Sequence, residues 1–179
     1  MNHFSPRPVS TEREVLRQHF LNAMSRIAST VNVVTTDGPA GRGGVTVTAM
    51  SSVSADTERP TMMVCIHKNS EAADKIRDNG VFCINVLGES QSDVSNSFAG
   101  RSEYERFSLG DWVSLKSGAP HLANSLAAFD CKVTECKLVG THFVFFGETQ
   151  GVCGPARRWL GRWVYRFPCP RRRLSRADW

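Results

Sequence analysis

The sequence has 179 residues, of which 41% are hydrophobic and 22% are charged, so it is long enough to form one globular domain with its own core. No run approaches the roughly 18 apolar residues that a membrane span needs, and the N-terminus lacks the apolar stretch of a signal peptide. These features argue against a membrane partner and predict a cytoplasmic protein.

The net charge of +5 is distributed unevenly along the chain. Residues 151–179 hold eight arginines and one aspartate, which leaves the rest with a net charge of −2. We therefore divide the chain into a domain at residues 1–152 and an atypical tail, rich in Arg, Trp and Pro, at residues 153–179. Such a tail could track a nucleic-acid backbone and stack on bases, but the acidic domain argues against nucleic acid as a partner.

The six cysteines are scattered and form no CxxC pair. Several of them, such as Cys65 and Cys83, lie within apolar runs, so we expect buried, reduced thiols. Because metal sites in proteins use closely spaced ligand pairs, this spacing predicts no metal site.

The first predicted element is an amphipathic helix over roughly residues 11–28. Thr11 and Glu14 have the spacing of a capping box, and apolar residues follow at helical intervals. A strand at residues 31–36 comes next and turns at 37–39. The glycine-rich residues 38–44 lead into a strand, whereas a dinucleotide fingerprint opens a helix, so they predict a hairpin connection.

Apolar and hydroxyl-bearing side chains alternate along residues 44–54, as in a single β-strand with one apolar face and one face of hydroxyl groups. Odd positions are expected to face a core, and even positions are expected to share the opposite face. The residues are Val45, Val47, Ala49 and Val53 on the first face and Thr46, Thr48, Ser52 and Ser54 on the second. Such a face suits a neutral, flat ligand with polar edges, although threonine also occurs on solvent-facing strands for its β-propensity.

The remaining elements complete a mainly β protein. Strands are predicted at residues 61–67, 81–87, 128–139 and 143–152, with a short helix from Ser70 to about Asn79 that Gly80 ends. Residues 90–97 form a polar segment, and residues 101–125 form a loop-rich region anchored by Phe107 and Trp112. Six strands and two helices without β-α-β alternation predict an antiparallel barrel with peripheral helices.

Three features could build a binding site: the hydroxyl strand, the helix start at Lys68-Asn69-Ser70, and His142 at a predicted hairpin turn. A helix N-terminus presents free amides and the positive end of the helix dipole, which suits a phosphate, and Lys68 adds a positive charge. Each feature has a plainer interpretation as a cap, a solvated lysine or a turn residue. His67 could equally be a satisfied partner at a strand end, and Phe98 could be a core residue.

Other chemistries lack their motifs. There is no nucleophile elbow, and no carboxylate has a sequence spacing from a histidine that would indicate a catalytic triad. Clustered carboxylates for a catalytic metal are also absent. What remains is a binding face for a phosphorylated, planar molecule with a neutral ring, and flavin mononucleotide fits that description.

An ordered series of motifs resembles the short-chain flavin reductases, the reductase components of two-component flavin-dependent monooxygenases. The motifs lie at residues 33–36, 44–54, 65–70, 82–87, 97–100, 118–120 and 140–147. The resemblance covers roughly residues 18–152. It weakens at the end of the chain, where only Val164-Tyr165-Arg166 is similar to the family's final strand.

The resemblance implies a split-barrel flavin-binding fold, built as an antiparallel six-stranded Greek-key barrel and usually found as a homodimer. It implies reduction of free FMN or FAD by NADH or NADPH. Carried over by position, Thr46, Val47, Thr48 and Ala49 line the edge of the isoalloxazine ring, and Ser52 and Ser54 belong to the same strand end. Lys68, Asn69 and Ser70 match the segment near the ribityl phosphate, Phe98 a residue beside the flavin, and His142 one near the nicotinamide.

The sequence therefore predicts an NAD(P)H:flavin oxidoreductase that supplies reduced flavin, by diffusion, to a separate monooxygenase. Because the flavin carries the chemistry, acid–base machinery is not required. The alternatives are a flavin-binding sensor or carrier without turnover and a nucleic-acid-binding protein that acts through its tail.

Overall fold

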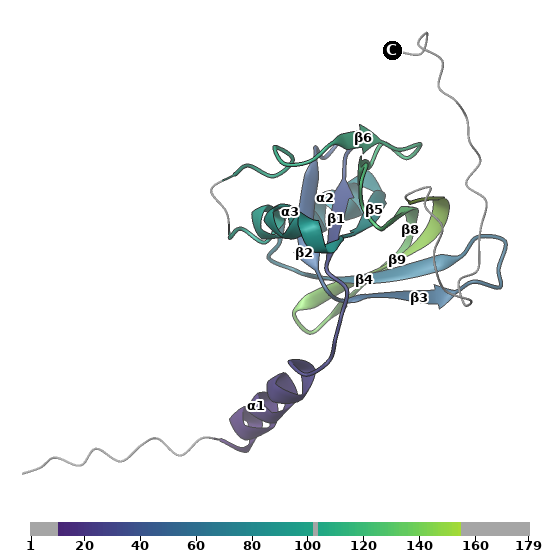
Figure 1. Cartoon of the computed structure of the whole chain (residues 1–179). Coiled ribbons are helices and arrows are strands. Elements are labelled where there is room, and N and C mark those ends of the chain that lie inside the picture. Colours follow the sequence, from purple (N-terminus) through teal and green to yellow (C-terminus); the bar gives the residue numbers. More distant parts are fainter. Residues whose placement is uncertain (1–10, 102–103, 155–179) are drawn as a thin grey trace, which may run out of the picture.

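The computed structural model describes residues 11–101 and 104–154, which form a mainly β domain (Figure 1). Its helices are α1 (Glu12–Met24), α2 (Glu71–Asn79) and α3 (Ser92–Phe98), with a short 3₁₀ turn, η1 (Glu89–Gln91). Its strands are β1 (Asn32–Thr36), β2 (Gly43–Val47), β3 (Met50–Ser54), β4 (Thr61–His67), β5 (Val81–Val86), β6 (Trp112–Ser114), β7 (Pro120–Leu122), β8 (Ala127–Val139) and β9 (His142–Cys153).

Seven strands form one antiparallel sheet in the order β2-β1-β5-β8-β9-β4-β3, and β6 and β7 form a separate two-stranded sheet. β2 and β3 stand at opposite edges of the large sheet although they are consecutive in the chain. Their connection bends the sheet into a split barrel, and β2 contacts β4 across the bend. The predicted fold class is confirmed. The strand count is not, because the described residues contain nine strands rather than six.

The predicted single hydroxyl strand at residues 44–54 is wrong. The chain breaks at Thr48 and Ala49, and the two halves run along different edges of the sheet. Val45 and Val47 pack against the core as expected, but Ala49 is exposed and Val53 is 52% exposed. A bulge between Ser52 and Ser54 shifts the register again. Period-2 alternation therefore does not carry across the break, and the four hydroxyls do not share one face.

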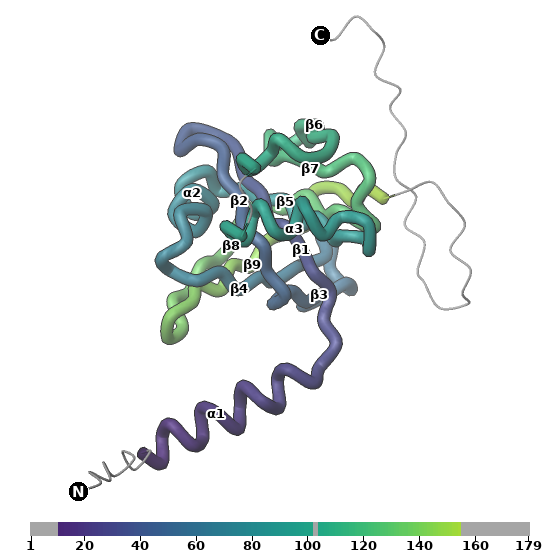
Figure 2. The backbone as a smooth tube through the Cα atoms, turned by 60° about the vertical axis from the view of Figure 1, so that its left-hand side comes forward, coloured from purple at the N-terminus to yellow at the C-terminus, as the bar shows by residue number. Residues whose placement is uncertain are grey.

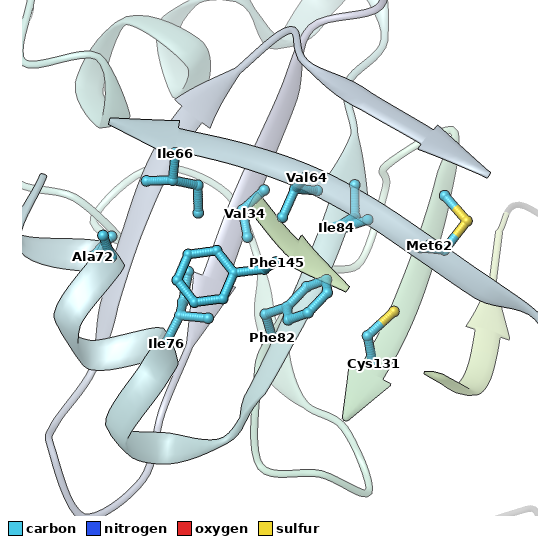
Figure 3. Packing of buried hydrophobic residues seen from close by; sticks show 11 residues of the cluster. Val34, Met62, Val64, Ile66, Ala72, Ile76, Phe82, Ile84, Cys131 and Phe145 are labelled. Carbon is cyan, nitrogen blue, oxygen red and sulfur yellow. The ribbon is translucent and has the colours of Figure 1, made fainter. Parts of the chain in front are cut away.

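The barrel interior is filled by apolar side chains from five strands and is closed on one side by α2 (Figure 3). Phe82, Phe145 and Ile66 are fully buried there, and Ile76 from α2 packs against them. Burial raises the pKa of the Cys131 thiol to about 12. That thiol therefore stays protonated at neutral pH, as expected for a buried structural cysteine.

A second apolar cluster lies between β1, α3 and the β6–β7 hairpin. Phe98 at the end of α3 meets the rings of Phe107 and Trp112, with ring centroids 4.8 and 5.4 Å away, so the two predicted anchors are confirmed. Phe98 also needs Gly44, because a Cβ at that position would lie 2.5 Å from its ring. The segment at residues 90–97, which we described only as polar, is mostly helical and places Val94 and Phe98 four residues apart on the buried side.

Helix α1 begins with the predicted capping box, in which the Glu14 carboxylate accepts from the Thr11 amide at 2.9 Å. The helix buries none of its residues and projects away from the barrel in both views (Figures 1 and 2). Its exposed apolar residues include Leu16, Phe20 and Met24. Within residues 11–101 and 104–154, no helix has the length and apolar character needed to cross a membrane.

Candidate functional site

The loop between β4 and α2 meets the β8–β9 hairpin at one end of the barrel. His67, the last residue of β4, is paired with His142, the first residue of β9. The Lys68 amide donates to the Thr141 carbonyl at 2.9 Å, and the two imidazole rings lie edge to face with centroids 5.1 Å apart. The predicted site residues Lys68, Asn69, Ser70 and His142 are therefore brought together.

The start of α2 has side-chain donors that have no partner within residues 11–101 and 104–154. Ser70 is the N-cap residue, but its hydroxyl makes no capping hydrogen bond. Lys68 is exposed and forms no ion pair with any residue that the structure describes. Glu71, the first residue of α2, lies 2.5 Å from the Lys75 ammonium, and this contact lowers the pKa of its carboxyl. The start of α2 thus offers the Ser70 hydroxyl, the nearby Lys68 cation and the amides of the first turn other than those of Ser70 and Ala73, which bond to backbone carbonyls. This combination is suited to a phosphate.

The break between β2 and β3 lies beside the same end of β4. The Ala49 carbonyl accepts from the Cys65 amide at 3.0 Å, two residues before His67. Thr48 and Ala49 are both exposed, and the Thr48 side chain makes no hydrogen bond within the described part of the chain. This corner places a hydroxyl and exposed backbone near the loop at residues 67–70.

Four predicted site residues lie elsewhere or are otherwise engaged. The Thr46 hydroxyl donates to the Ser95 carbonyl at 2.7 Å and so fastens β2 to α3. Ser54 is paired with Thr61 at the far end of β4, roughly 20 Å from His67 at the rise of a strand, and Ser52 lies between. Phe98 is only 1% exposed, which favours the core interpretation and leaves its proposed place beside a flavin without support.

Sequence reasoning missed the part that His67 and Thr141 play in this site. The interpretation of His67 as a satisfied partner at a strand end is confirmed, since its Nδ1 accepts from the Asn69 amide at 3.1 Å. The Thr141 carbonyl connects the β8–β9 hairpin to the β4–α2 loop. Because every residue has a backbone carbonyl, the residue type at position 141 does not predict this bond. The one available signal was a histidine at the end of one predicted strand, His67, and another directly before a second predicted strand, His142.

A second polar cluster lies beneath the β6–β7 hairpin and is built differently. Asn85 is fully buried, donates to the Val33 carbonyl at 3.1 Å and accepts from the Leu122 amide at 2.8 Å. Burial raises the pKa of Asp130 despite hydrogen bonds from Ser117. Burial also lowers the pKa of His121, and the negative charge of Asp130 partly offsets this. Asn85 bonds to backbone, Asp130 to Ser117 and His121 to the Ser125 hydroxyl, so these groups have structural roles in the core.

The donors around the β4–α2 loop fit a flavin nucleotide by their chemistry. Lys68, the Ser70 hydroxyl and the amides of α2 suit its phosphate, while Thr48 and the backbone of the corner suit the polar edge of a ring. His142 is exposed beside them, with its Nδ1 3.0 Å from the Thr141 hydroxyl. No group of three or more metal-ligating side chains occurs among the residues described.

Known proteins share sequence and fold with this chain. The family model described as the flavin reductase like domain matches residues 24–158. The chain belongs to this family. It is 44% identical to the FMN reductase (NADH) RutF of Pantoea ananatis over 138 residues, covering 76% of this chain and 72% of that protein.

Two solved structures have the same fold. Nitrilotriacetate monooxygenase component B of Mycobacterium thermoresistibile matches with a TM-score of 0.73 and 29% identity, covering 83% of this chain and 81% of that one. The Streptomyces globisporus NADH:FAD oxidoreductase SgcE6, in complex with NAD and FAD fragments, matches with a TM-score of 0.69 and 28% identity. That match covers 86% of this chain and 90% of that one.

Proposed function

We propose that this protein is an NADH-dependent flavin reductase whose site is the junction of the β4–α2 loop, the β8–β9 hairpin and the β2–β3 corner. The observation that carries the proposal is the backbone bond from Lys68 to Thr141. This bond holds the phosphate-type donors and His142 together in a chain of the flavin reductase like domain family.

The flavin, when bound, supplies the chemistry by accepting a hydride from the nicotinamide. Lys68 and Ser70 bind the phosphate through charge and hydrogen bonding, and Thr48 with the backbone of Val47 and Ala49 orients the ring edge. His142, at the exposed end of β9, contacts the nicotinamide and holds it against the flavin. Since hydride transfer needs two stacked rings at close range, positioning is the main contribution of these residues.

The name of the Pantoea relative supports FMN and NADH as the pair used here, while the NAD and FAD fragments in SgcE6 keep FAD as the other candidate. The monooxygenase component among the relatives supports a separate oxygenase partner. That partner receives reduced flavin by diffusion. Supply of NADH from metabolism fits a cytoplasmic location.

A homodimer is part of this proposal. Isolated helices of about 12–15 residues are marginal in water, yet the 13 residues of α1 bury no side chain against their own barrel. A second copy would cover its apolar face. Light scattering should give twice the chain mass, and a monomer with fully formed α1 would contradict this.

The decisive test is steady-state oxidation of NADH or NADPH with added FMN or FAD, together with the variant His142→Ala. We expect the variant to raise the KM for NADH or lower kcat/KM, with flavin affinity within a few-fold of the wild type. Leu138→Ala, at an exposed site in the same hairpin, is the control and should leave both unchanged. Unchanged NADH kinetics in His142→Ala would remove this residue from the site.

The alternative is a flavin-binding sensor or carrier that uses the same phosphate site without turnover. It is distinguished by flavin binding without flavin-dependent NADH consumption in air. The tail at residues 153–179, on which nucleic-acid binding would depend, lies outside the described residues except for its first two.

A further inference from the structure

His67 is the residue at which the two halves of the proposed site meet. It ends β4 opposite His142, and its side chain is exposed. Its ring meets the His142 ring at an interplanar angle of 84° with centroids 5.1 Å apart. The Thr141 hydroxyl lies on the Nδ1 side of His142 at 3.0 Å. The His142 ring therefore has one neighbour on its own hairpin and one on β4.

The same residue closes the loop that carries the phosphate-type donors. Its Nδ1 accepts from the Asn69 amide at 3.1 Å, and its carbonyl accepts from the Ser70 amide at 2.8 Å. A backbone amide can only donate, so Nδ1 is the acceptor in this bond.

We propose that His67 is a positioning residue that orders the Lys68-Asn69-Ser70 loop through its Nδ1 and orients His142 through the edge-to-face contact of the two rings. This inference rests on the proposed function and extends it to a residue that touches neither ligand. The two contacts are made by different parts of one side chain. Flavin binding depends on the first contact and nicotinamide positioning on the second.

Three substitutions separate these contacts. His67→Asn keeps an acceptor at the position of Nδ1, because Oδ1 is the same number of bonds from the backbone, and removes the ring. His67→Phe keeps a ring and removes the acceptor. His67→Ala removes both. His19→Ala, at an exposed position on α1, controls for loss of an imidazole away from the site.

The experiment measures the flavin Kd by fluorescence and the NADH kcat and KM for each variant, with thermal midpoints alongside. We expect His67→Ala and His67→Phe to weaken flavin binding about fivefold, the effect of one lost hydrogen bond, and His67→Asn to restore it. We expect kcat/KM for NADH to fall about tenfold in His67→Ala and His67→Asn, and to recover in His67→Phe.

Wild-type flavin affinity and kinetics in all three variants would overturn the inference, and so would equal losses in all three that track a fall in thermal midpoint. A wild-type protein that binds flavin but does not oxidise NADH would overturn the proposed function instead. In that case the flavin Kd values of the Asn and Phe variants still decide the role of Nδ1. A wild-type protein that does not bind flavin overturns both.

Discussion

Two polar clusters lie in different parts of this barrel, and they use their hydrogen-bonding groups in opposite ways. Beneath the β6–β7 hairpin, Asn85, Thr35 and Asp130 are buried, and their partners belong to the protein. At the β4–α2 loop, Lys68 and His142 are exposed, and the Ser70 hydroxyl makes no capping bond. Buried polar groups must be satisfied internally to be tolerated. Exposed polar groups that have no partner among the described residues are free to bind a ligand.

The comparison teaches that polarity and burial must be considered together before a function is assigned. His121 and Asp130 have shifted pKa values, which often mark functional sites. Here the shifts come from burial in a structural layer. We expect substitutions in the buried cluster to affect folding, and substitutions in the exposed cluster to affect ligands. Four predictions test this division.

The largest effect is expected for Asn85→Ala. The substitution leaves the Leu122 amide and the Val33 carbonyl without their buried partner, which should lower the free energy of unfolding by about 2–4 kcal/mol. Urea unfolding measures this change, and Asn96→Ala, at an exposed position, is the matched control. A variant of normal stability with impaired flavin binding would reverse the assignment of the two clusters.

A smaller effect, on ligand affinity alone, is expected for Lys68→Ala and Ser70→Ala. Each removes one donor from the proposed phosphate site and should weaken FMN binding by about 1–3 kcal/mol. Stability should hardly change, because neither side chain has an ion pair or capping bond within the described residues. Fluorescence titration with FMN provides the measurement, and Lys116→Ala is the control for charge. Normal affinity in both variants would place the phosphate elsewhere.

Thr48→Val tests whether the hydroxyl at the break between β2 and β3 binds the ligand or supports the fold. Valine keeps the shape and β-branching of threonine but removes the hydroxyl, so we expect FMN binding to weaken by about 0.5–1.5 kcal/mol with folding intact. Thr134→Val also removes a hydroxyl, one that donates to the Phe146 carbonyl at 3.2 Å, and should leave FMN affinity unchanged. If Thr48→Val lowered the thermal midpoint and bound FMN normally, Thr48 would belong with the structural residues.

The smallest effect concerns the pH dependence of stability. The lowered pKa of His121 means that the unfolded chain takes up this proton first as the pH falls below the ordinary value of about 6.5. Stability should therefore decrease with acidification in that range. The raised pKa of Asp130 has the opposite effect on stability, because the folded chain takes up this proton before the unfolded chain does. This effect is confined to a pH range just above the ordinary pKa of 3.8.

Thermal midpoints between pH 7.5 and 5 test this assignment. We expect His121→Asn to flatten the dependence and His19→Asn, at an exposed site, to leave it as in the wild type. An equal slope in all three proteins would mean that His121 does not contribute.

The sequence predicted the fold class and the loop at Lys68-Asn69-Ser70 because these depend on local signals: strand alternation, a cap residue and a terminating glycine. It did not predict that Thr48 and Ala49 break a strand, since their pattern continues the alternation and only the curvature of the sheet separates the halves. Helix α3 was missed because its polar residues hide the spacing of Val94 and Phe98. The bond from Lys68 to Thr141 is carried by backbone, so it has no residue signature.

The order of strands also has a consequence for synthesis of the chain. β8 and β9 occupy the middle of the sheet, between β5 and β4, although among the described strands they are the last to leave the ribosome. A nascent chain that ends before residue 127 can pair β1 with β2 and β5, and β3 with β4, but these two groups share no strand pairing. The adjoining edges of β5 and β4 are left open, and open edges invite pairing with other chains. Closure of the barrel, and with it the meeting of His67 and His142, must wait for the final hairpin.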